Sequence, residues 1–352
     1  MVQQVTIENF KSIESLTLEL GRVNVFFGEN GSGKSNILEA IAMGSAAASN
    51  KLDNEFLTSR GIRVTEPQAM RSGFRKESLD KNIEISFVKG AMQDEEKHSY
   101  KLIHSNDFYS TWICERTVQR VSEELKLRRA DGSLFRFQIY SPENYFLRRF
   151  EDESQIAPLG IRGEGLFKLL SVIYEEKPEQ FQKIREHLEV IDWFEGFEIP
   201  DDLRFTERRI RIKDRFIEDG LSYFDQRSSN EGFLYLLFYF SLFVSDYTPQ
   251  FFAIDNIDNA MNPKLASQLV KQLSHLAKEH DKQVIMTTHN PAVLDGLDLK
   301  DEEQRLFVIS RNKLGHTKAL RITHKPTPEG LDPVRLSEQF LRGYIGGLPK
   351  NF

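Results

Sequence analysis

The chain contains almost no cysteine, and this limits the kinds of protein it can be. Cys114 is the single cysteine among 352 residues. One thiol cannot form an internal disulfide framework, nor can it supply a cysteine-rich metal site. It does suit a reducing compartment, so we expect a cytoplasmic protein.

The sequence also has no hydrophobic run long enough to cross a membrane. Its most apolar stretch, residues 233–244, is followed directly by Ser245 and Asp246. That stretch is too short for a membrane span, and we predict a buried helix instead. The first residues alternate in polarity and include Glu8, unlike a signal peptide. We therefore expect no membrane partner.

An excess of positive charge is missing as well. Lys and Arg number 47 against 53 Asp and Glu, which gives a formal net charge of −6. No global basic field therefore draws the chain to nucleic acid or to a membrane surface. A local basic groove remains compatible with this balance.

The most specific motif is the run Gly28-Glu29-Asn30-Gly31-Ser32-Gly33-Lys34-Ser35. It follows an apolar run and precedes a helix-like segment, the context of a phosphate-binding P-loop. Glycines let backbone N–H groups point at phosphate oxygens, while Lys34 reaches the β- and γ-phosphates and Ser35 binds Mg²⁺. An ordinary glycine-rich turn is the alternative. We predict that ATP and Mg²⁺ are bound by Asn30, Gly31, Ser32, Gly33, Lys34, Ser35 and Asn36.

Two later segments are candidates for the rest of this site. The apolar residues 251–254 end in Asp255, which would join Ser35 in holding the metal. Residues 284–287 lead to Thr288, His289, Asn290 and Pro291, where His289 would reach the γ-phosphate from the carboxyl end of a strand. A plain core strand and a structural histidine are the alternatives.

Periodicity predicts an α/β fold. We expect helices at 36–49, 166–190, 263–279 and 333–343, and a strand pair with one basic face around 204–213. The other expected strands are 2–8, 16–20, 23–27, 81–88, 100–103, 109–114, 134–140, 251–255, 283–287, 305–310 and 318–322.

The order of these motifs resembles the ABC-type ATPase heads of the SMC, RecF and OLD group. The likeness covers about 1–50 and 226–310, and residues 7–13, Ile-Glu-Asn-Phe-Lys-Ser-Ile, look like that group's usual start. It implies a P-loop NTPase head whose mixed, largely parallel core sheet is joined by an antiparallel β-subdomain and a helical insertion lobe. We expect an N-terminal ATPase lobe at 1–165, a helical and charged insertion lobe at 166–225, and a C-terminal ATPase lobe at 226–352.

The resemblance also implies a head-to-tail dimer that closes over two ATP molecules. In such a dimer a signature loop of one copy contacts the nucleotide of the other. Ser229, Asn230 and Gly232, at the start of the apolar helix, are the candidates here. The family pattern is Leu-Ser-X-Gly, and either Ser229 or Asn230 could supply the contact. A simple helix N-cap is the alternative.

The clearest departure from the family lies beside Asp255. The group usually has Glu at the next position, as the base that activates water, but this chain has Asn256. An amide can orient water but cannot accept its proton, so Asp258 is the substitute candidate. The expected catalytic set is Lys34, Asp255, Asn256, Asp258 and His289, with slow hydrolysis and ATP serving as a switch unless Asp258 acts as the base.

Nuclease motifs are missing too. Only about sixty residues follow His289, with no acidic cluster for a two-metal nuclease and no zinc-like histidine spacing. The resemblance therefore points to an ATPase subunit of a bacterial anti-phage defence complex, such as the Septu ATPase, that controls a separate nuclease or toxin effector. A RecF-like DNA-repair protein and a non-hydrolysing ATP-bound scaffold are the alternatives.

Two basic stretches bear on a contact with double-stranded DNA. They could grip duplex phosphates on a dimer, or they could be solvated surfaces balanced by acids such as Asp201, Asp202 and Glu207. Arg60 and Arg63 could instead reach ATP. The stretches comprise Arg60, Arg63, Arg71, Arg75 and Lys76, then Arg204, Arg208, Arg209, Arg211 and Lys213.

Overall fold

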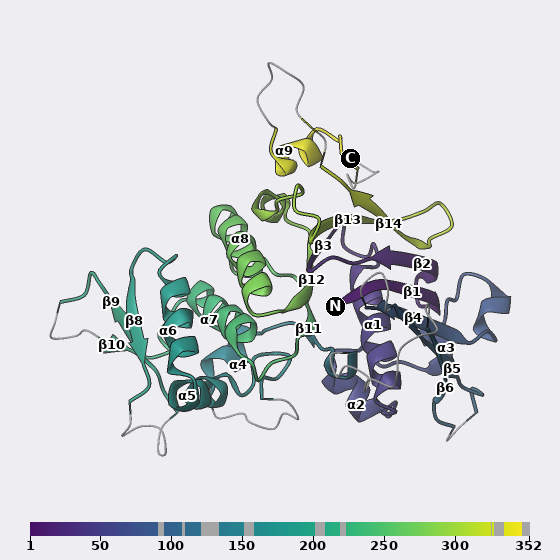
Figure 1. Cartoon of the computed structure of the whole chain (residues 1–352), viewed down its shortest axis with the longest axis horizontal. Helices are drawn as coiled ribbons and strands as arrows, with labels where there is room; N and C mark the ends of the chain where they lie inside the picture. The colour runs from purple at the N-terminus through teal and green to yellow at the C-terminus, as the bar shows by residue number, and fades with distance from the viewer. Residues whose placement is uncertain are drawn as a thin grey trace. The chain divides into compact units, whose positions relative to one another are not determined.

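A computed structural model describes residues 1–90, 95–107, 110–120, 134–150, 158–200, 208–218, 223–324, 326 and 334–346. Arg204 and its acidic neighbours at 201, 202 and 207 lie outside the described residues. The chain forms two compact units (Figure 1). The first comprises Met1–Ile139, Gln250–Ile257 and Gln283–Phe352, and the second Tyr140–Pro249 and Asp258–Lys282. The three lobes divided at 165 and 225 stay a prediction.

The core sheet of the first unit is mixed and largely parallel. Its strand order is β14-β13-β3-β12-β11-β7. Strands β11, β12, β3 and β13 run parallel, while β14 pairs antiparallel with β13. All residues of β3, β11 and β12 are buried, as expected for apolar strands covered on both faces. The bounds are β3 Val23–Phe27, β7 Ile139–Tyr140, β11 Phe251–Ile254, β12 Gln283–Thr288, β13 Gln304–Arg311 and β14 Thr317–Ile322.

An antiparallel sheet with the order β2-β1-β4-β5-β6 completes the first unit. Its strands alternate buried and more exposed residues, so one face enters the core. Helix α1 (Lys34–Ala48) covers that buried face (Figure 1). The bounds are β1 Val2–Phe10, β2 Ile13–Glu19, β4 Ile83–Lys89, β5 Glu96–Ile103 and β6 Ile113–Arg120.

Short helices connect the strands of the first unit. Phe340 of α9 packs edge-on against Phe27, with 4.6 Å between the ring centroids, so the last helix contacts the strand that leads into the P-loop. The short helices are α2 (Asn54–Ser59), α3 (Pro67–Met70), α9 (Leu336–Leu341) and the 3-10 turns η1 (Lys76–Leu79), η2 (Leu134–Arg136) and η3 (Pro291–Gly296).

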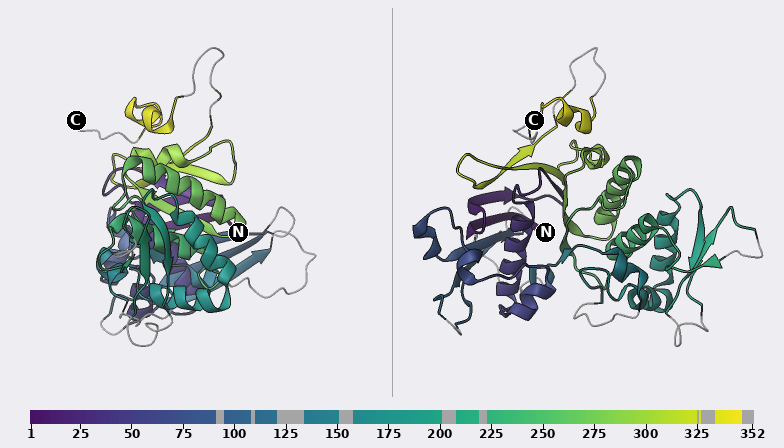
Figure 2. Two further views of the ribbon diagram at one scale, coloured as in Figure 1. Left: turned by 90° about the vertical axis from the view of Figure 1, so that its left-hand side faces the viewer. Right: turned by 180° about the vertical axis from the view of Figure 1, so that it is seen from behind.

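The second unit is mainly helical (Figure 2). Helix α7 (Glu231–Val244) is buried from Phe233 to its end, as predicted for the apolar stretch, and α4, α5, α6 and α8 pack around it. None of the helices in the described ranges is long and apolar enough to cross a membrane. The remaining bounds are α4 Asn144–Arg148, α5 Leu166–Glu176, α6 Pro178–Leu188, α8 Pro263–Glu279, and a small sheet of β8 Phe194–Glu198, β9 Arg211–Asp214 and β10 Tyr223–Phe224.

Several predicted elements differ in their extent from the observed ones. Within the described residues the strand pair expected around 204–213 is the single strand β9, which pairs with β8 and β10 instead. The single helix at 166–190 is two helices, because Pro178 lacks the N–H that would continue α5 and instead begins α6. The strand at 134–140 is a 3-10 turn followed by only two strand residues. The strand expected at 109–114 starts at Ile113 and runs to Arg120, because pairing with β5 rather than local polarity sets its limits.

Candidate functional site

The carboxyl ends of three parallel strands meet at one edge of the core sheet. In the strand register Phe27 is paired with Thr288, and Ile254 with Met286. The P-loop follows β3, Asp255 follows β11 and His289 follows β12. The structure therefore brings these predicted segments together at the edge where ligands of open α/β sheets bind.

Glycines shape the P-loop between β3 and α1. Gly31 has φ +76° and Gly33 has φ +108°, backbone conformations that L side chains rarely adopt. Gly33 precedes the first residue of α1, so the amino end of the helix faces the loop. The Lys34 ammonium is buried and donates to the carbonyl oxygens of Gly28 and Glu29 at 2.7 and 2.9 Å.

Asp255 lies against the P-loop. The Ser35 hydroxyl donates to one carboxylate oxygen of Asp255 at 3.1 Å. The Thr287 hydroxyl donates to the other oxygen at 2.5 Å and accepts a bond from the Asn256 N–H at 2.9 Å. This network fixes the orientation of the carboxylate beside Ser35.

The donors at this edge fit a nucleotide with a divalent metal. Carboxylate and hydroxyl oxygens are hard ligands, and Mg²⁺ is commonly held by one or two protein oxygens together with phosphates and water. Ser35 and Asp255 present two such oxygens. The described residues contain no group of three or more His, Cys, Asp or Glu placed to hold a metal. Ser32 Oγ is also buried with no hydrogen-bond partner in the described structure.

Asn256 follows Asp255 directly, and His289 follows the neighbouring strand β12. Asn256 has φ +56°, in the left-handed region that Asn tolerates better than most residues. Its side chain is half-buried, while that of His289 is exposed. Asn290 then caps η3, its side chain accepting from the Ala292 N–H at 3.0 Å. Both predicted positions are thus accessible at the end of the sheet.

A cavity of about 770 Å³ adjoins the start of α1. The buried Glu39 carboxylate accepts from Lys11 and, at 2.5 Å, from Arg63 Nε. It therefore holds two cations at the cavity wall, one of which, Arg63, the sequence had suggested for ATP. Residues lining this cavity include Lys11, Ser12, Asn36, Arg63, Arg71 and Phe74.

The predicted signature segment belongs to the second unit. The Asn230 side chain accepts from the Phe233 N–H at 2.8 Å, so Asn230 is the N-cap of α7. The Ser229 hydroxyl is buried and has no hydrogen-bond partner within the described residues. Helix α4 supports the segment, because Arg148 donates to the Arg227 carbonyl at 2.6 Å and Asn144 to Glu231 at 2.5 Å.

Asp258 also belongs to the second unit. Burial, with added repulsion from Tyr235 and Asp258, raises the pKa of the fully buried Tyr239 well above its ordinary value. Asp258 is therefore an electrostatic neighbour of α7, and its role as a base stays a prediction.

Acidic partners accompany much of the basic sequence. In the second unit Arg211 lies 3.5 Å from Glu198 and Lys213 lies 2.6 Å from Glu195. In the first unit Arg71 is buried, and loss of solvation lowers its pKa. The ion pairs of Arg211 and Lys213 favour the interpretation of balanced surface charge for these two residues, whereas the buried Arg71 is not part of a basic surface.

Several residues around the P-loop were not among the predicted site residues. Thr287, which orients Asp255, stands next to the predicted Thr288-His289 turn and could have been found from that motif. Ser12 lies in the Phe10–Ile13 turn quoted for the family likeness. Thr317 also bonds the loop, but nothing in the local sequence marks it, because it approaches only through sheet pairing.

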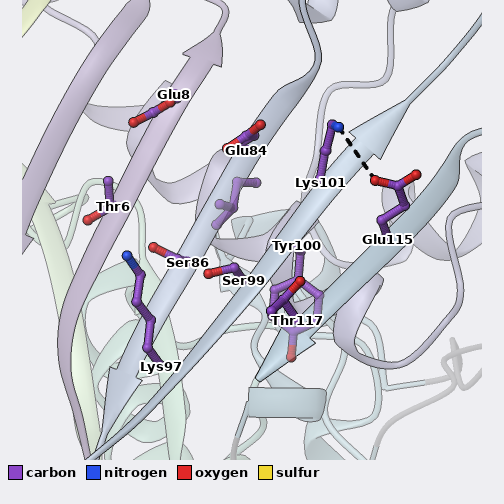
Figure 3. A pocket seen from close by; sticks show the side chains of 11 residues that line it. Thr6, Glu8, Glu84, Ser86, Lys97, Ser99, Tyr100, Lys101, Glu115 and Thr117 are labelled. Carbon is purple, nitrogen blue, oxygen red and sulfur yellow. Dashed lines mark ion pairs between the residues drawn. The ribbon is translucent and has the colours of Figure 1, made fainter. Parts of the chain in front are cut away.

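A second hollow, of about 220 Å³, lies on the polar face of the antiparallel sheet (Figure 3). Thr6, Ser86, Ser99 and Thr117 follow one another across four paired strands. Lys101 pairs with Glu115 at 3.5 Å beside this row. No predicted site residue lines the hollow, so the nucleotide candidates stay at the edge of the core sheet.

Comparison with known proteins agrees with this architecture. The family described as "AAA domain, putative AbiEii toxin, Type IV TA system" matches residues 23–295. The DNA replication and repair protein RecF of Clostridium novyi is 33% identical over 130 residues, 36% of this chain and 34% of RecF. RecF of Listeria welshimeri is 42% identical over 55 residues, 15% of each protein. The chain thus matches about a third or less of the length of these relatives.

Solved structures show the same fold at low identity. An SMC head bound to the C-winged helix domain of ScpA aligns with a TM-score of 0.60 and 15% identity, covering 92% of this chain and 98% of that one. The SMC head domain from Thermotoga maritima aligns with a TM-score of 0.52 and 16% identity, covering 92% and 99%.

Proposed function

The chain belongs to the family described as "AAA domain, putative AbiEii toxin, Type IV TA system" and is an ATPase domain of the SMC and RecF type. From this premise we propose that it binds ATP with Mg²⁺. The hydrogen bond of 3.1 Å between Ser35 Oγ and Asp255 carries the proposal. It brings the end of the P-loop and the carboxylate after β11 to one point, as a metal bridging protein and phosphates requires.

The phosphates would lie over backbone N–H groups of residues 30–36, at the amino end of α1. Lys34 would exchange its contacts with the Gly28 and Glu29 carbonyls for phosphate oxygens. The cavity beside Asn36 would take the rest of the nucleotide, with Lys11 and Arg63 at its wall. His289, exposed after β12, would reach the γ-phosphate.

We also propose that two copies close head to tail over the nucleotide, with Ser229, Asn230 and Gly232 of one copy covering ATP on the other. The open space around Gly232 supports this head-to-tail arrangement. A Cβ there would meet only Asn230 Oδ1 at 3.5 Å and the Ala260 carbonyl oxygen at 3.6 Å, which are ordinary contacts. Nothing described inside the chain demands a glycine, although glycine costs about 1 kcal/mol relative to alanine in a helix. Close approach of another molecule would explain it.

Hydrolysis should be slow, because Asn256 stands where the base is usual and an amide cannot accept a proton. ATP then acts mainly as a switch that holds the dimer. Asp258 is the alternative base if closure of the dimer places it beside the water molecule that attacks the γ-phosphate.

The experiment is steady-state phosphate release from ATP, with Lys34→Ala as the blank. We expect turnover little above the blank and an increase in Asn256→Glu, although Glu must adopt a left-handed backbone there at a cost of about 1 kcal/mol. Rapid wild-type turnover that only Asp258→Ala abolishes would refute the switch and assign the base to Asp258. Bound ATP with no turnover in any variant would favour a non-hydrolysing scaffold.

The biological role we propose is control of a separately encoded nuclease or toxin effector in a bacterial anti-phage defence complex. The family description, which names a toxin of a type IV TA system, supports a role of this kind. RecF-like DNA repair is the second candidate, favoured by the partial matches to RecF. Co-purification with the product of a neighbouring gene would support the first, and ATP-dependent binding to duplex DNA without any effector would support the second.

A further inference from the structure

A chain of side-chain hydrogen bonds bridges the two sides of the P-loop. Asn36 Nδ2 donates to Ser12 Oγ at 2.6 Å, and Ser12 Oγ lies 2.7 Å from Thr317 Oγ1. Thr317 Oγ1 in turn donates to the Ser32 carbonyl oxygen at 3.1 Å. Ser32 precedes and Asn36 follows the Gly33-Lys34-Ser35 core of the loop, so the chain begins and ends on the phosphate-binding segment.

The direction of every proton in this relay is fixed by its two ends. An amide nitrogen can only donate and a carbonyl oxygen can only accept. Thr317 donates its single hydroxyl proton to the Ser32 carbonyl. In the hydrogen bond between the Ser12 and Thr317 hydroxyls, Ser12 is therefore the donor. Each hydroxyl therefore donates once and accepts once, and the relay has one consistent arrangement.

The relay is buried and closely fitted. Thr317 is fully buried and Ser12 is 4% exposed. A Cβ on Gly33 would lie 2.0 Å from Thr317 Oγ1 and 3.0 Å from Ser12 Oγ, so both hydroxyls sit directly against the loop. Water cannot readily replace a bond lost in such a place, and an unmatched group there carries a desolvation cost.

We propose that Ser12 and Thr317 are positioning residues that set the spacing between Ser32 and Asn36, so that the intervening N–H groups converge on phosphate before the nucleotide arrives. This inference rests on the proposed nucleotide binding. A loop held in its bound geometry loses less entropy on binding. Removing the relay should therefore weaken nucleotide affinity more than it weakens the fold.

Other contacts should keep the fold intact without the relay. The Thr317 N–H donates to the Ser12 carbonyl at 2.8 Å, and β14 stays paired with β13 along its length. His316 Nδ1 lies 2.9 Å from Glu14 Oε2, which also joins the β13–β14 hairpin to β2. Thr317→Val keeps the shape of the side chain and these three contacts, and it removes only the hydroxyl.

The test is titration of the full chain with fluorescent N-methylanthraniloyl-ATP and Mg²⁺. For Thr317→Val we expect a Kd about tenfold higher than wild type, from the loss of one to two buried hydrogen bonds. Thr317→Ser, which keeps the hydroxyl, should bind within about twofold of wild type. Thr117→Val, at an exposed position of β6, is the matched control and should bind as wild type.

A double-mutant cycle with Ser12→Ala separates positioning from general damage. Thr317→Val and Ser12→Ala break the same relay. The double variant should therefore bind nucleotide no more weakly than the single variant with the higher Kd. Equal Kd values for wild type and both single variants, or independent losses that multiply in the double variant, would overturn the relay. A wild type that binds no better than Lys34→Ala would overturn the proposed nucleotide site as well, so the two failures are distinguishable.

Discussion

Two glycines of the P-loop offer a matched test of how closely this loop is packed. Gly33→Ala would place a Cβ 2.0 Å from Thr317 Oγ1 and 2.9 Å from Thr317 Cγ2, so rotating the Thr317 side chain only exchanges one clash for another. Gly31→Ala would meet nothing within 4 Å. Both positions have positive φ, +108° and +76°, so both variants carry backbone strain and only one carries the clash.

The expected costs follow from this difference. A left-handed backbone costs an L-residue about 1–2 kcal/mol, and that is the whole expected effect of Gly31→Ala on the free energy of unfolding. For Gly33→Ala the clash and the broken relay bring the total to about 3–5 kcal/mol, the range of severe overpacking and buried hydrogen-bond loss. Nucleotide affinity should follow the same order.

Urea unfolding followed by circular dichroism gives the first quantity, and titration with fluorescent ATP gives the second. We expect Gly33→Ala to lose measurable nucleotide binding while Gly31→Ala retains it in weakened form. If the two variants unfold at the same urea concentration and bind alike, the close approach of Thr317 to Gly33 is not what shapes this loop.

Three further predictions concern other parts of the chain. Gly232→Ala should keep the free energy of unfolding or raise it by up to about 1 kcal/mol while weakening ATP-dependent dimerisation, and an unchanged dimer fraction in gel filtration with ATP would argue against a signature role. Asn230→Ala should lower the unfolding free energy by about 1 kcal/mol through loss of the N-cap, whereas Asn230→Ser should restore most of it in the same urea assay. Burial lowers the pKa of His98 below its ordinary value of 6.5 in the folded chain. As the pH falls through 6.5 the unfolded chain therefore binds more protons than the folded chain does, and the free energy of unfolding decreases. His98→Gln should flatten this decline between about pH 7 and pH 5 in urea melts, and an unchanged slope would show that other groups cause it.

The sequence was sufficient for several local elements, including the segment that carries the candidate nucleotide site. Val23–Phe27 and Pro263–Glu279 were predicted with their observed bounds, because an unbroken apolar run and a capped, regularly spaced helix carry their own signals. The P-loop could be found for the same reason, since its glycines and the flanking strand and helix are contiguous. The break at Pro178 could also have been read locally, but the apolar spacing on either side of it concealed the break.

Only the tertiary structure decided which distant residues support that loop. Asp255 meets Ser35, and Ser12 and Thr317 meet each other, because parallel pairing of β11, β12, β3 and β13 and the β13–β14 hairpin set their register. Register depends on which strands become neighbours, and one-dimensional periodicity does not contain that information. The P-loop could therefore be identified from the sequence, whereas the buried hydroxyls that support it reach the loop only when the strands pair.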